Sequence, residues 1–346
     1  MPLVNVIDPL QDARWPQFLE SRHDASLFHS TEWLDALRRT YGFHPCALTT
    51  SRPWEPLING LVFCRVQSWI TGRRLISVPF SDHCTPLVDD ETEFEPLLSG
   101  LQEEASQGKQ HLEIRSIAGG PATAPGLTVS GTFCLHRLDL RPTLDELFRT
   151  FHGSCIRRRI KRAEREGLRY DDGTSEEQLH GFYQLVVRTR RRQGIPPQPL
   201  SWFRNLIACH GENLKIRLAC HNGQPVAGIL TIRYKSTMTY KYGCSDPEFH
   251  HLGPMQLLMW TAIRQAKESG LLEFDMGRTD WSNEGLLTFK DRWGANRSTL
   301  LYLRYPALTP PSRTQQVAAR VAKWFMACAP DRVVTAAGSI LYPHFA

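Results

Sequence analysis

One stretch of polar residues near residue 280 is placed where chemistry often occurs. A short apolar run from Leu271 ends at Asp275 and Gly277, which predicts a buried strand that opens into a loop. That loop is dense in hydrogen-bonding side chains: Arg278, Thr279, Asp280, Ser282, Asn283 and Glu284. A polar loop between a strand end and a helix start is a usual place for a binding or catalytic site. The alternative is a loop that only caps the fold.

A short helix is predicted directly after this loop. Leu286 and Phe289 are among its apolar residues, and Gly294 ends it. Lys290 lies on this helix, flanked by Phe289 and Trp293, so we expect its side chain to be held in a fixed direction. We expect its ammonium group to be exposed in a cleft, where it contributes little to stability. The alternative is an ordinary lysine on a helix surface.

A cluster of basic residues marks a second candidate site. A helix is predicted from Ser154, which can cap it, to Gly167, which ends it. Four cations on this helix suit phosphate binding: Arg157, Arg158, Arg159 and Lys161. The alternative is a solvated face, which charge runs usually are.

A second arginine-rich helix is predicted over residues 174–193. Thr174 and Glu177 have the spacing of a capping box at its start. Its last turns carry four arginines: Arg188, Arg190, Arg191 and Arg192. The negative end of the helix dipole alone explains these cations.

The N-terminal half contains two further candidate contacts. Trp33 lies on a predicted helix over residues 30–41, which Gly42 ends. A turn-rich loop over residues 78–86 brings together Ser81, Asp82 and His83. This loop is either the wall of a site or a buried loop held by its own polar groups.

Composition narrows the class of protein. The 346 residues exceed the usual size of one core, so two domains of about 150 residues are the default. No apolar run reaches the roughly 18 residues that a membrane span needs, and the first 15 residues lack the basic start of a secretory signal. Nine scattered cysteines without a Cys-x-x-Cys pair predict reduced, packed thiols and no metal site. We therefore expect a cytoplasmic protein, with the inner face of the membrane as the alternative location.

One helix–strand pattern occurs twice in the sequence. A predicted helix over residues 92–107, a stop at Gly108 and a strand over 111–116 reappear as helix 254–269, Gly270 and strand 271–275. This pattern predicts a tandem duplication of one α/β unit. The predicted domains are residues 1–142, residues 143–306 and a helical tail over 307–346.

Several motifs together resemble the FemAB-like branch of the GNAT acyltransferase superfamily. The motifs are Asp275–Thr279, Asn283–Leu286, Phe289–Lys290, Trp293–Gly294, Phe28–Trp33, Arg157–Arg165, Thr189–Arg192 and Tyr240–Gly243. They span nearly the whole chain. The resemblance implies an α/β fold of two GNAT-type domains, each a mixed central sheet flanked by helices.

The resemblance also implies a reaction and roles for residues. FemAB-like enzymes transfer an acyl group, commonly aminoacyl from tRNA, to an amine on a cell-wall precursor. The family assigns the position of Lys290 to binding the donor end and stabilising the developing charge, with Arg278 as a second cation. Chemically, Asp82, His83, Asp275 and Glu284 all qualify as the general base. The candidate substrate contacts are Arg157, Arg158, Arg159, Lys161, Ser81, Asp82, His83, Trp33, Tyr242, Asn283 and Thr279.

The residues near the start of the predicted helix 254–269 bear on the donor. GNAT enzymes that use acyl-CoA hold its pyrophosphate on backbone N–H groups of an Arg/Gln-x-x-Gly-x-Gly/Ala loop. In the run His250–Met255 only Gly253 fits, because Pro254 lacks an N–H and Met255 adds bulk. We therefore expect aminoacyl-tRNA as co-substrate, with acyl-CoA as the alternative, and no bound cofactor.

Three functions stay open at this stage. The first is aminoacyl transfer to a phosphate-bearing or lipid-linked envelope precursor of peptidoglycan type. The second is acyl-CoA-dependent acylation of an amino sugar or exopolysaccharide precursor. The third is a non-catalytic basic module that binds nucleic acid or anionic membrane, which the polar loops far from the arginine helices disfavour. A basic amphipathic helix predicted over residues 312–328 either docks on the protein or contacts a membrane surface, and a short helix follows over 331–338.

Overall fold

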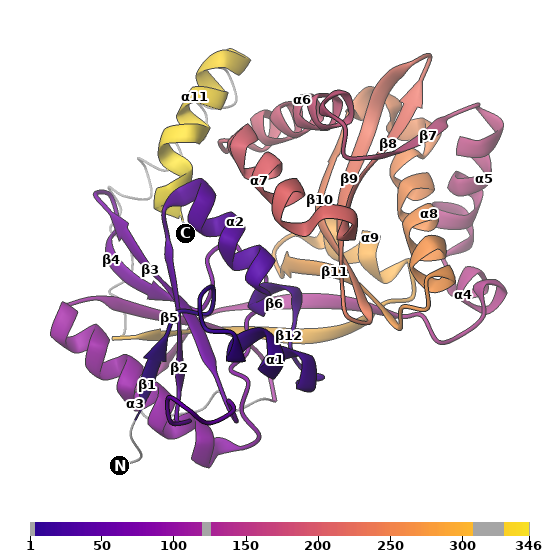
Figure 1. Ribbon diagram of the computed structural model, residues 1–346. Helices are drawn as coiled ribbons and strands as arrows, with labels where there is room; N and C mark the ends of the chain where they lie inside the picture. The colour runs from indigo at the N-terminus through magenta and orange to yellow at the C-terminus, as the bar shows by residue number, and fades with distance from the viewer. Residues whose placement is uncertain (1–3, 120–125, 307–328, 346) are drawn as a thin grey trace. The chain divides into compact units, whose positions relative to one another are not determined.

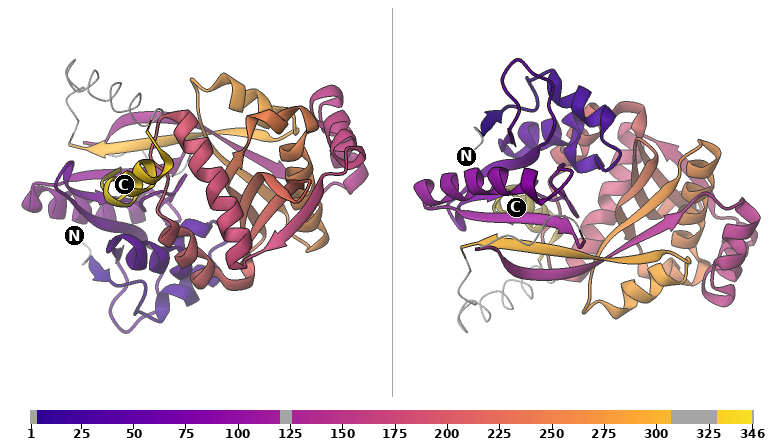
Figure 2. Two further views of the ribbon diagram at one scale, coloured as in Figure 1. Left: turned by 90° about the horizontal axis from the view of Figure 1, so that it is seen from above. Right: turned by 90° about the horizontal axis from the view of Figure 1, so that it is seen from below.

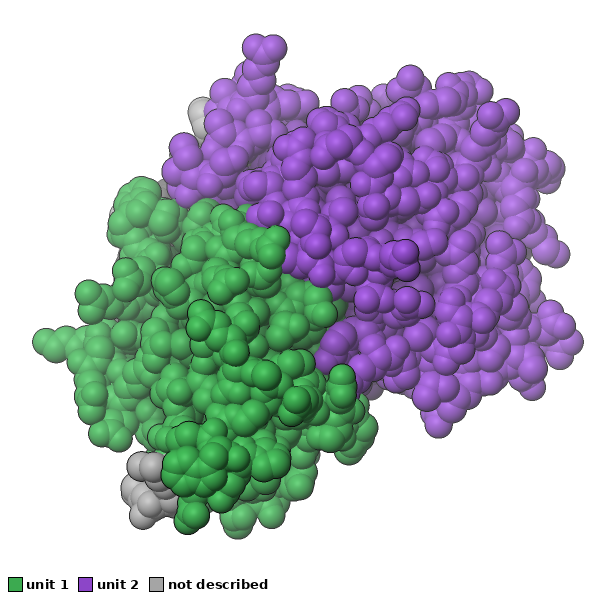
Figure 3. All heavy atoms as spheres, viewed as in Figure 1, with its two compact units in different colours: residues 1–133, 298–310, 343–346 green, residues 134–297, 311–342 purple. Residues whose placement is uncertain are grey.

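The chain divides into two compact units. The computed structural model describes residues 4–119, 126–306 and 329–345 (Figure 1). Unit 1 comprises Met1–Phe133, Ser298–Pro310 and Pro343–Ala346, and unit 2 comprises Cys134–Arg297 and Pro311–Tyr342 (Figure 3). Strands β6 (Thr128–Asp139) and β12 (Asn296–Tyr305) each pass from one unit into the other. The units are therefore discontinuous, whereas the sequence predicted contiguous domains.

Unit 1 is built on a mixed sheet with the strand order β1-β2-β3-β4-β5-β12-β6. Its elements are β1 (Asn5–Ile7), α1 (Arg14–Ser21), η1 (Leu27–His29), α2 (Thr31–Tyr41), β2 (His44–Thr49), β3 (Leu61–Ser68), β4 (Gly72–Ile76), α3 (Glu91–Gly108), β5 (His111–Ile117) and the terminal turn η5 (Tyr342–Phe345). Helix α3 buries Phe94, Leu97 and Leu101 against Phe63 and Leu112 of the sheet. Burial of apolar side chains on one helix face is what docks such a helix.

The strands of unit 2 follow the order β6-β11-β10-β9-β8-β7, with both parallel and antiparallel pairs. Its further elements are α4 (Leu144–Thr150), the π-helical turn η2 (Gly153–Arg157), α5 (Arg158–Arg165), β7 (Arg169–Gly173), α6 (Glu176–Gln193), α7 (Leu200–His210), η3 (Gly211–Asn213), β8 (Leu214–His221), β9 (Gln224–Tyr234), β10 (Thr237–Ser245), η4 (Pro247–Leu252), α8 (Pro254–Glu268), β11 (Glu273–Asp280), α9 (Glu284–Asp291) and α11 (Asp331–Leu341).

Side-chain alternation divides the two faces of the unit 2 sheet. Ala227 and Ile229 of β9 belong to the same core as Leu258 of α8 and Ile160 of α5. The intervening Gly228 lies against Phe182 of α6. Helices α5 and α8 therefore pack on one face and α6 on the other, as the views in Figure 2 also show.

The predicted duplication is confirmed by the topology. In unit 1, β4 and β5 are parallel neighbours joined through α3, and in unit 2, β10 and β11 are parallel neighbours joined through α8. Each of these pairs follows an antiparallel meander, β2-β3-β4 and β8-β9-β10. The fold is therefore a tandem of two mixed α/β units.

Two helix ends depart from the sequence-based prediction. Helix α3 ends at Lys109 in the left-handed region (φ 49°), and Gly108 is still helical. The turn η2 is capped by His152, whose Nδ1 accepts a hydrogen bond from the Cys155 amide, and Ser154 is not the cap. A histidine cap is hard to foresee because Ser, Thr, Asp and Asn are the usual capping residues.

The start of α6 is displaced by one residue. Ser175 and Gln178 form the capping box, in place of the predicted Thr174 and Glu177. Both pairs have the same spacing, so the sequence pattern does not choose between them. The end of α6 agrees with the prediction, because Gly194 adopts the left-handed conformation (φ 68°).

The stretch around residue 280 is more regular than predicted. Strand β11 continues to Asp280, so the connector to α9 is only residues 281–283.

The predicted helix over residues 312–328 lies outside the described residues. Helix α11 is three residues longer than the predicted 331–338. No helix among the described residues has the length and apolar character to cross a bilayer.

A buried ion cluster joins two neighbouring strands of unit 1. Glu113 of β5 lies opposite Arg304 of β12 in the sheet, and its carboxylate accepts hydrogen bonds from the Nε atoms of Arg304 and Arg115, each at 2.8 Å. Burial by itself would raise the pKa of Glu113, but the two guanidinium groups outweigh it, so the pKa lies below the ordinary value. The cluster stabilises unit 1 only while Glu113 is ionised.

We predict that Glu113→Ala lowers the free energy of unfolding by about 3 kcal/mol, because it leaves two arginines without their carboxylate. Urea unfolding measures this change. Glu55→Ala, which removes an exposed ion pair with Arg52, is the matched control and should change it by less than about 0.5 kcal/mol. Since the folded pKa of Glu113 is depressed, its contribution should be present above about pH 4.3 and fade as pH falls further. Equal effects of the two substitutions would contradict this account.

Candidate functional site

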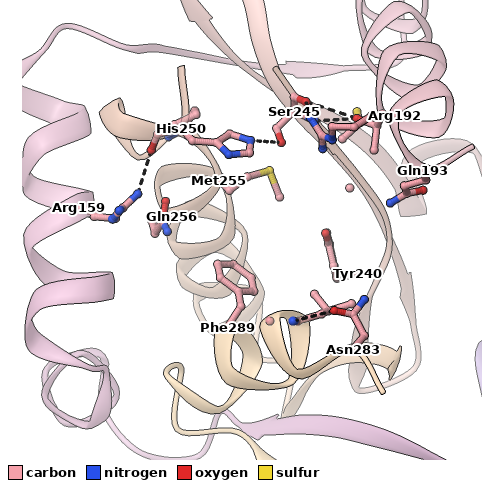
Figure 4. Close-up of a pocket in the computed structure, with 16 residues that line it drawn as sticks. Arg159, Arg192, Gln193, Tyr240, Ser245, His250, Met255, Gln256, Asn283 and Phe289 are labelled. Atoms are coloured by element: carbon pink, nitrogen blue, oxygen red, sulfur yellow. Dashed lines mark hydrogen bonds between the residues drawn. The ribbon is translucent and has the colours of Figure 1, made fainter. Parts of the chain in front are cut away.

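Unit 2 contains a pocket of about 540 Å³ (Figure 4). Its walls come from the end of α6, from β10, from η4, from the start of α8, from α9 with its cap, and from one residue of α5. It is lined by Arg159, Thr189, Arg192, Gln193, Tyr240, Gly243, Cys244, Ser245, His250, Pro254, Met255, Gln256, Asn283, Gly285, Leu286 and Phe289. Its volume suits a ligand of the size that small-molecule sites usually hold.

A one-residue bulge in β10 decides which tyrosine faces the pocket. Tyr240 pairs with Thr231 of β9, and Tyr242 pairs with Leu230, so Lys241 is an extra residue. Without the bulge, both tyrosines would lie on one face of the sheet, because side chains alternate. Tyr240 therefore faces α8 and the pocket, while Tyr242 packs in the core on the other face. There its hydroxyl accepts a hydrogen bond from Trp202 Nε1 at 2.8 Å.

The pocket wall carries positive charge. Arg159 donates from Nη1 to the His250 carbonyl at 2.9 Å, and Arg192 donates from Nη1 to the Ser245 carbonyl at 3.4 Å. Met255 and Gln256 lie in the first turn of α8, where backbone N–H groups have no partner within the helix. Among the described lining residues there is no aspartate or glutamate. The wall is therefore suited to an anionic ligand.

A serine and a histidine meet inside this wall. Ser245 is the last residue of β10, and His250 lies five residues later on η4. Ser245 Oγ and His250 Nε2 are 2.8 Å apart (Figure 4). Partial burial of the ring and then the Arg192 guanidinium lower the pKa of His250, against the opposing effect of Asp246. The imidazole is thus neutral at pH 7 and able to accept a proton.

The opposite wall is aromatic and apolar. Phe289 and Leu286 of α9 line the pocket together with Met255 of α8. Burial raises the pKa of Tyr240, so its hydroxyl stays protonated. Gly243 must lack a side chain, because an added Cβ would collide with the Tyr240 hydroxyl. Flat rings beside cationic groups are suited to stacking a nucleic-acid base.

Only two of the sequence-predicted candidates line this pocket. Asn283 caps α9, accepting from the Leu286 amide at 3.1 Å, and Arg159 reaches the pocket from α5. Arg158 and Lys161 are exposed on α5 away from it, and Arg157 is half-buried in η2. The basic helix is thus mostly a solvated face, with one arginine turned toward the pocket.

The residues predicted to be catalytic, which lie on or near β11, do not line this pocket. Lys290 is 2% exposed, and its Nζ donates to the carbonyls of Gly277 at 2.7 Å and Arg278 at 3.3 Å. The expectation of an exposed ammonium was therefore wrong. The apolar neighbours Phe289 and Trp293 turn the helix so that the lysine points at the strand. Its role in the reaction stays a prediction.

The remaining unit 2 candidates do not line the pocket. Asp275 is buried and accepts from the Gly277 amide at 2.7 Å, so its carboxylate holds the strand end. Arg278 and Glu284 are exposed. Thr279 is buried, and its Oγ1 has no hydrogen-bond partner among the described residues. Asp275 and Glu284 thus stay candidate bases without a described pocket around them.

The N-terminal candidates all belong to unit 1. Trp33 is fully buried and makes an edge-to-face contact with Phe28, which also contacts the His83 ring. Ser81 Oγ donates to the Val78 carbonyl at 2.8 Å, and the Asp82 carbonyl accepts from the Tyr302 hydroxyl at 3.0 Å. These contacts are those of a buried loop held by its own polar groups, which was one of the two interpretations of this loop from the sequence. The roles of these residues in binding stay predictions.

Sequence reasoning quoted many of the pocket residues as parts of motifs, but it chose only Arg159 and Asn283 as site residues. It interpreted Arg192 as a partner of the helix dipole and Met255 as bulk at a helix start, and it gave no site role to Tyr240, Ser245 or His250. The spacing of Ser245 and His250 carries no recognised signature, because a five-residue separation brings them together only through the turn η4. The signal that was present is Gly243, a strand glycine, since such a residue often marks a bulge or a close approach.

Comparison with known proteins agrees with this architecture. Residues 153–291 match the family model of the acetyltransferase (GNAT) domain. This region holds every residue of the pocket. No curated protein matches the sequence.

Solved structures share the fold over most of the chain. FemX has a TM-score of 0.67 at 15% identity, covering 92% of this chain and 100% of its own. The C-terminal domain of a protein from Agrobacterium fabrum, named as a lysylphosphatidylglycerol synthetase, has a TM-score of 0.56 at 13% identity, covering 92% and 96%. A tandem GNAT protein from the clavulanic acid biosynthesis pathway has a TM-score of 0.55 at 13% identity, covering 89% and 100%. At these identities the similarity concerns the fold.

We predict that Lys290→Met lowers the free energy of unfolding by about 1.5–3 kcal/mol, since the buried ammonium makes charge-assisted hydrogen bonds to β11. Methionine keeps the length of the stem and removes only the donor. Lys267→Met is the matched control, because Lys267 also donates to two carbonyls, Leu140 at 2.7 Å and Arg141 at 3.2 Å, but is half-exposed. Urea unfolding should show a clearly smaller loss for Lys267. An unchanged stability of Lys290→Met would mean that the lysine does not hold the strand.

Proposed function

Because residues 153–291 match the acetyltransferase (GNAT) domain and the chain shares its fold with FemX, we propose that it is an acyltransferase that transfers an aminoacyl group from aminoacyl-tRNA to an amine. The acceptor in this proposal is a phosphate-bearing precursor of the cell envelope. The observation that supports it best is the cation-lined, partly aromatic pocket of unit 2.

The proposed reaction is aminolysis of an ester. The acceptor amine attacks the acyl carbonyl, the N–C bond forms, and the C–O bond to the terminal ribose breaks. Arg159 and Arg192 provide positive charge for a donor phosphate, and the rings of Tyr240 and Phe289 provide a surface for its terminal base. A non-catalytic basic module would need the arginines but no pocket beside them.

The start of α8 supports tRNA over CoA as donor. Pro254 occupies the first helical position, where it offers no N–H to a pyrophosphate. The Cα of Gly253 is covered by α5, because an added Cβ would lie 2.7 Å from the Arg159 carbonyl. A phosphate group therefore finds fewer backbone donors here than the acyl-CoA loop supplies.

Acyl-CoA is the second candidate donor. It is favoured by the match to a domain named as an acetyltransferase. The chemistry of transfer is the same, with a thioester in place of the ester and an amino sugar or exopolysaccharide precursor as the acceptor.

An acceptor at the cell envelope is supported by the name of one protein with this fold. FemX and the lysylphosphatidylglycerol synthetase share the tandem architecture, and the second name refers to an aminoacylated phospholipid. The +6 net charge is compatible with an anionic acceptor of this kind. For a lipid-linked acceptor, the proposal includes contact of the protein with the membrane surface.

We predict that Arg159→Ala/Arg192→Ala weakens binding of charged tRNA and flattens its salt dependence. Each phosphate contact to a single strand contributes about 0.7 to the slope of log K against log salt, so the slope should fall by about 1.4. Fluorescence titration across a series of salt concentrations measures this change. The matched control is Arg162→Ala/Arg165→Ala, which removes two exposed arginines of the same α5 helix. The control should change the slope by less than the Arg159/Arg192 variant does.

The same titrations with CoA and acetyl-CoA separate the two donors. We expect no micromolar dissociation constant for either. Micromolar CoA binding that disappears in the Arg159/Arg192 variant would assign the pocket to acyl-CoA and overturn the tRNA proposal.

A further inference from the structure

The hydroxyl–imidazole pair of Ser245 and His250 has no role in the donor binding proposed above. Ser245 Oγ lies 2.8 Å from His250 Nε2, a normal hydrogen-bond distance, and both side chains line the pocket. Ser245 is 8% exposed, so its hydroxyl is sheltered from bulk water, whereas the histidine side is open. Such an arrangement can pass a proton from the pocket interior to the imidazole.

The position of the serine is fixed by its neighbours. Its backbone N–H donates to Thr189 Oγ1 at 3.1 Å, and its carbonyl accepts from Arg192 Nη1 at 3.4 Å. His250 is tied in turn by its carbonyl, which accepts from Arg159 Nη1 at 2.9 Å. A proton acceptor must be held in this way to act with a defined geometry.

The charged groups around His250 keep its ring neutral. Arg159 faces it from α5 and Arg192 from α6, and both disfavour a second positive charge. On its own segment, Asp246 is engaged by Arg188 Nη1 at 3.1 Å. The Nδ1 atom of the neighbouring His251 lies 2.8 Å from the Glu248 carbonyl oxygen, at hydrogen-bond distance, and His251 does not line the pocket. The residues of α8 and α9 that line the pocket are not titratable.

We propose that Ser245 and His250 together accept the proton of the attacking amine, which deepens and rests on the proposed acyl transfer. As the amine nitrogen bonds to the acyl carbon, its proton moves to Ser245 Oγ while the hydroxyl proton moves to His250 Nε2. The bond from the acyl carbon to the donor oxygen, or sulfur, then breaks. The imidazolium returns the proton to that leaving atom, so the pair is restored.

A small electrophile tests the pair without any substrate. Phenylmethylsulfonyl fluoride reacts with a serine hydroxyl whose proton an imidazole accepts, forming an O–S bond and releasing fluoride. We expect mass spectrometry of the full chain to place one sulfonyl group on Ser245. The labelling rate should rise as His250 loses its proton and level off, with a midpoint below the ordinary histidine value of about 6.5.

Two neighbouring histidines form the matched comparison. His250→Gln should lower the labelling rate about 100-fold, the lower end of the contribution of a general base. His251→Gln should leave the rate within about twofold, since that ring points away from the pocket. Absence of label on Ser245, or equal labelling in His250→Gln and the wild type, would overturn the proposal.

Turnover separates this proposal from the proposed function. With the donor and amine that the wild type uses, His250→Gln and Ser245→Ala should lower kcat about 100-fold while the dissociation constant of the donor stays the same. Normal kcat in both variants would refute the proton acceptor and leave acyl transfer intact. Labelling of Ser245 in a wild type that discharges neither charged tRNA nor acetyl-CoA would support the pair and refute the proposed function.

Discussion

The extra residue in β10 is the constraint on which the site of unit 2 depends. The register between β10 and β9 shifts between Tyr240 and Tyr242, so the side-chain alternation of β10 is inverted after Lys241. Tyr240 is thereby turned toward α8, and Gly243 and Ser245 follow it on that face. Tyr242 is turned into the core beside Trp202. A strand of regular alternation would place both rings together and leave Ser245 on the wrong side of the sheet.

The walls of the pocket are held by contacts that lie outside it. The N-terminus of α8 meets α5 where Gly253 allows the Arg159 carbonyl to approach, and the Arg159 side chain ties α5 to η4. On the other side, Lys290 anchors α9 to β11 through two carbonyls, which positions Phe289 at the pocket. The Phe-Lys motif therefore has a structural role that is visible in its contacts, whatever it also does in the reaction. Removing that link should disturb the aromatic wall as well as the strand.

Charge and proton transfer are linked in this arrangement. The same arginines that suit a donor phosphate also keep a nearby imidazole neutral, because each disfavours a second cation. A pocket with aspartate or glutamate beside His250 would do the reverse and hold the ring protonated. Phosphate recognition and proton acceptance are thus compatible within one site. The phosphate of a bound donor would oppose the arginines in part, so the ionisation of His250 should depend on occupancy.

The sequence by itself determined the local elements and the family resemblance. Helix α2 ends at Gly42 and helix α6 ends at Gly194, as predicted, because a helix end depends on residues close together in the chain. Repeated helix–strand units likewise revealed the tandem architecture. Only the tertiary structure decided the return of β12 to unit 1, the bulge at Lys241, the burial of Lys290 and the meeting of Ser245 with His250. Each of these depends on pairing or packing between distant segments, and such contacts leave no periodic trace in the local sequence.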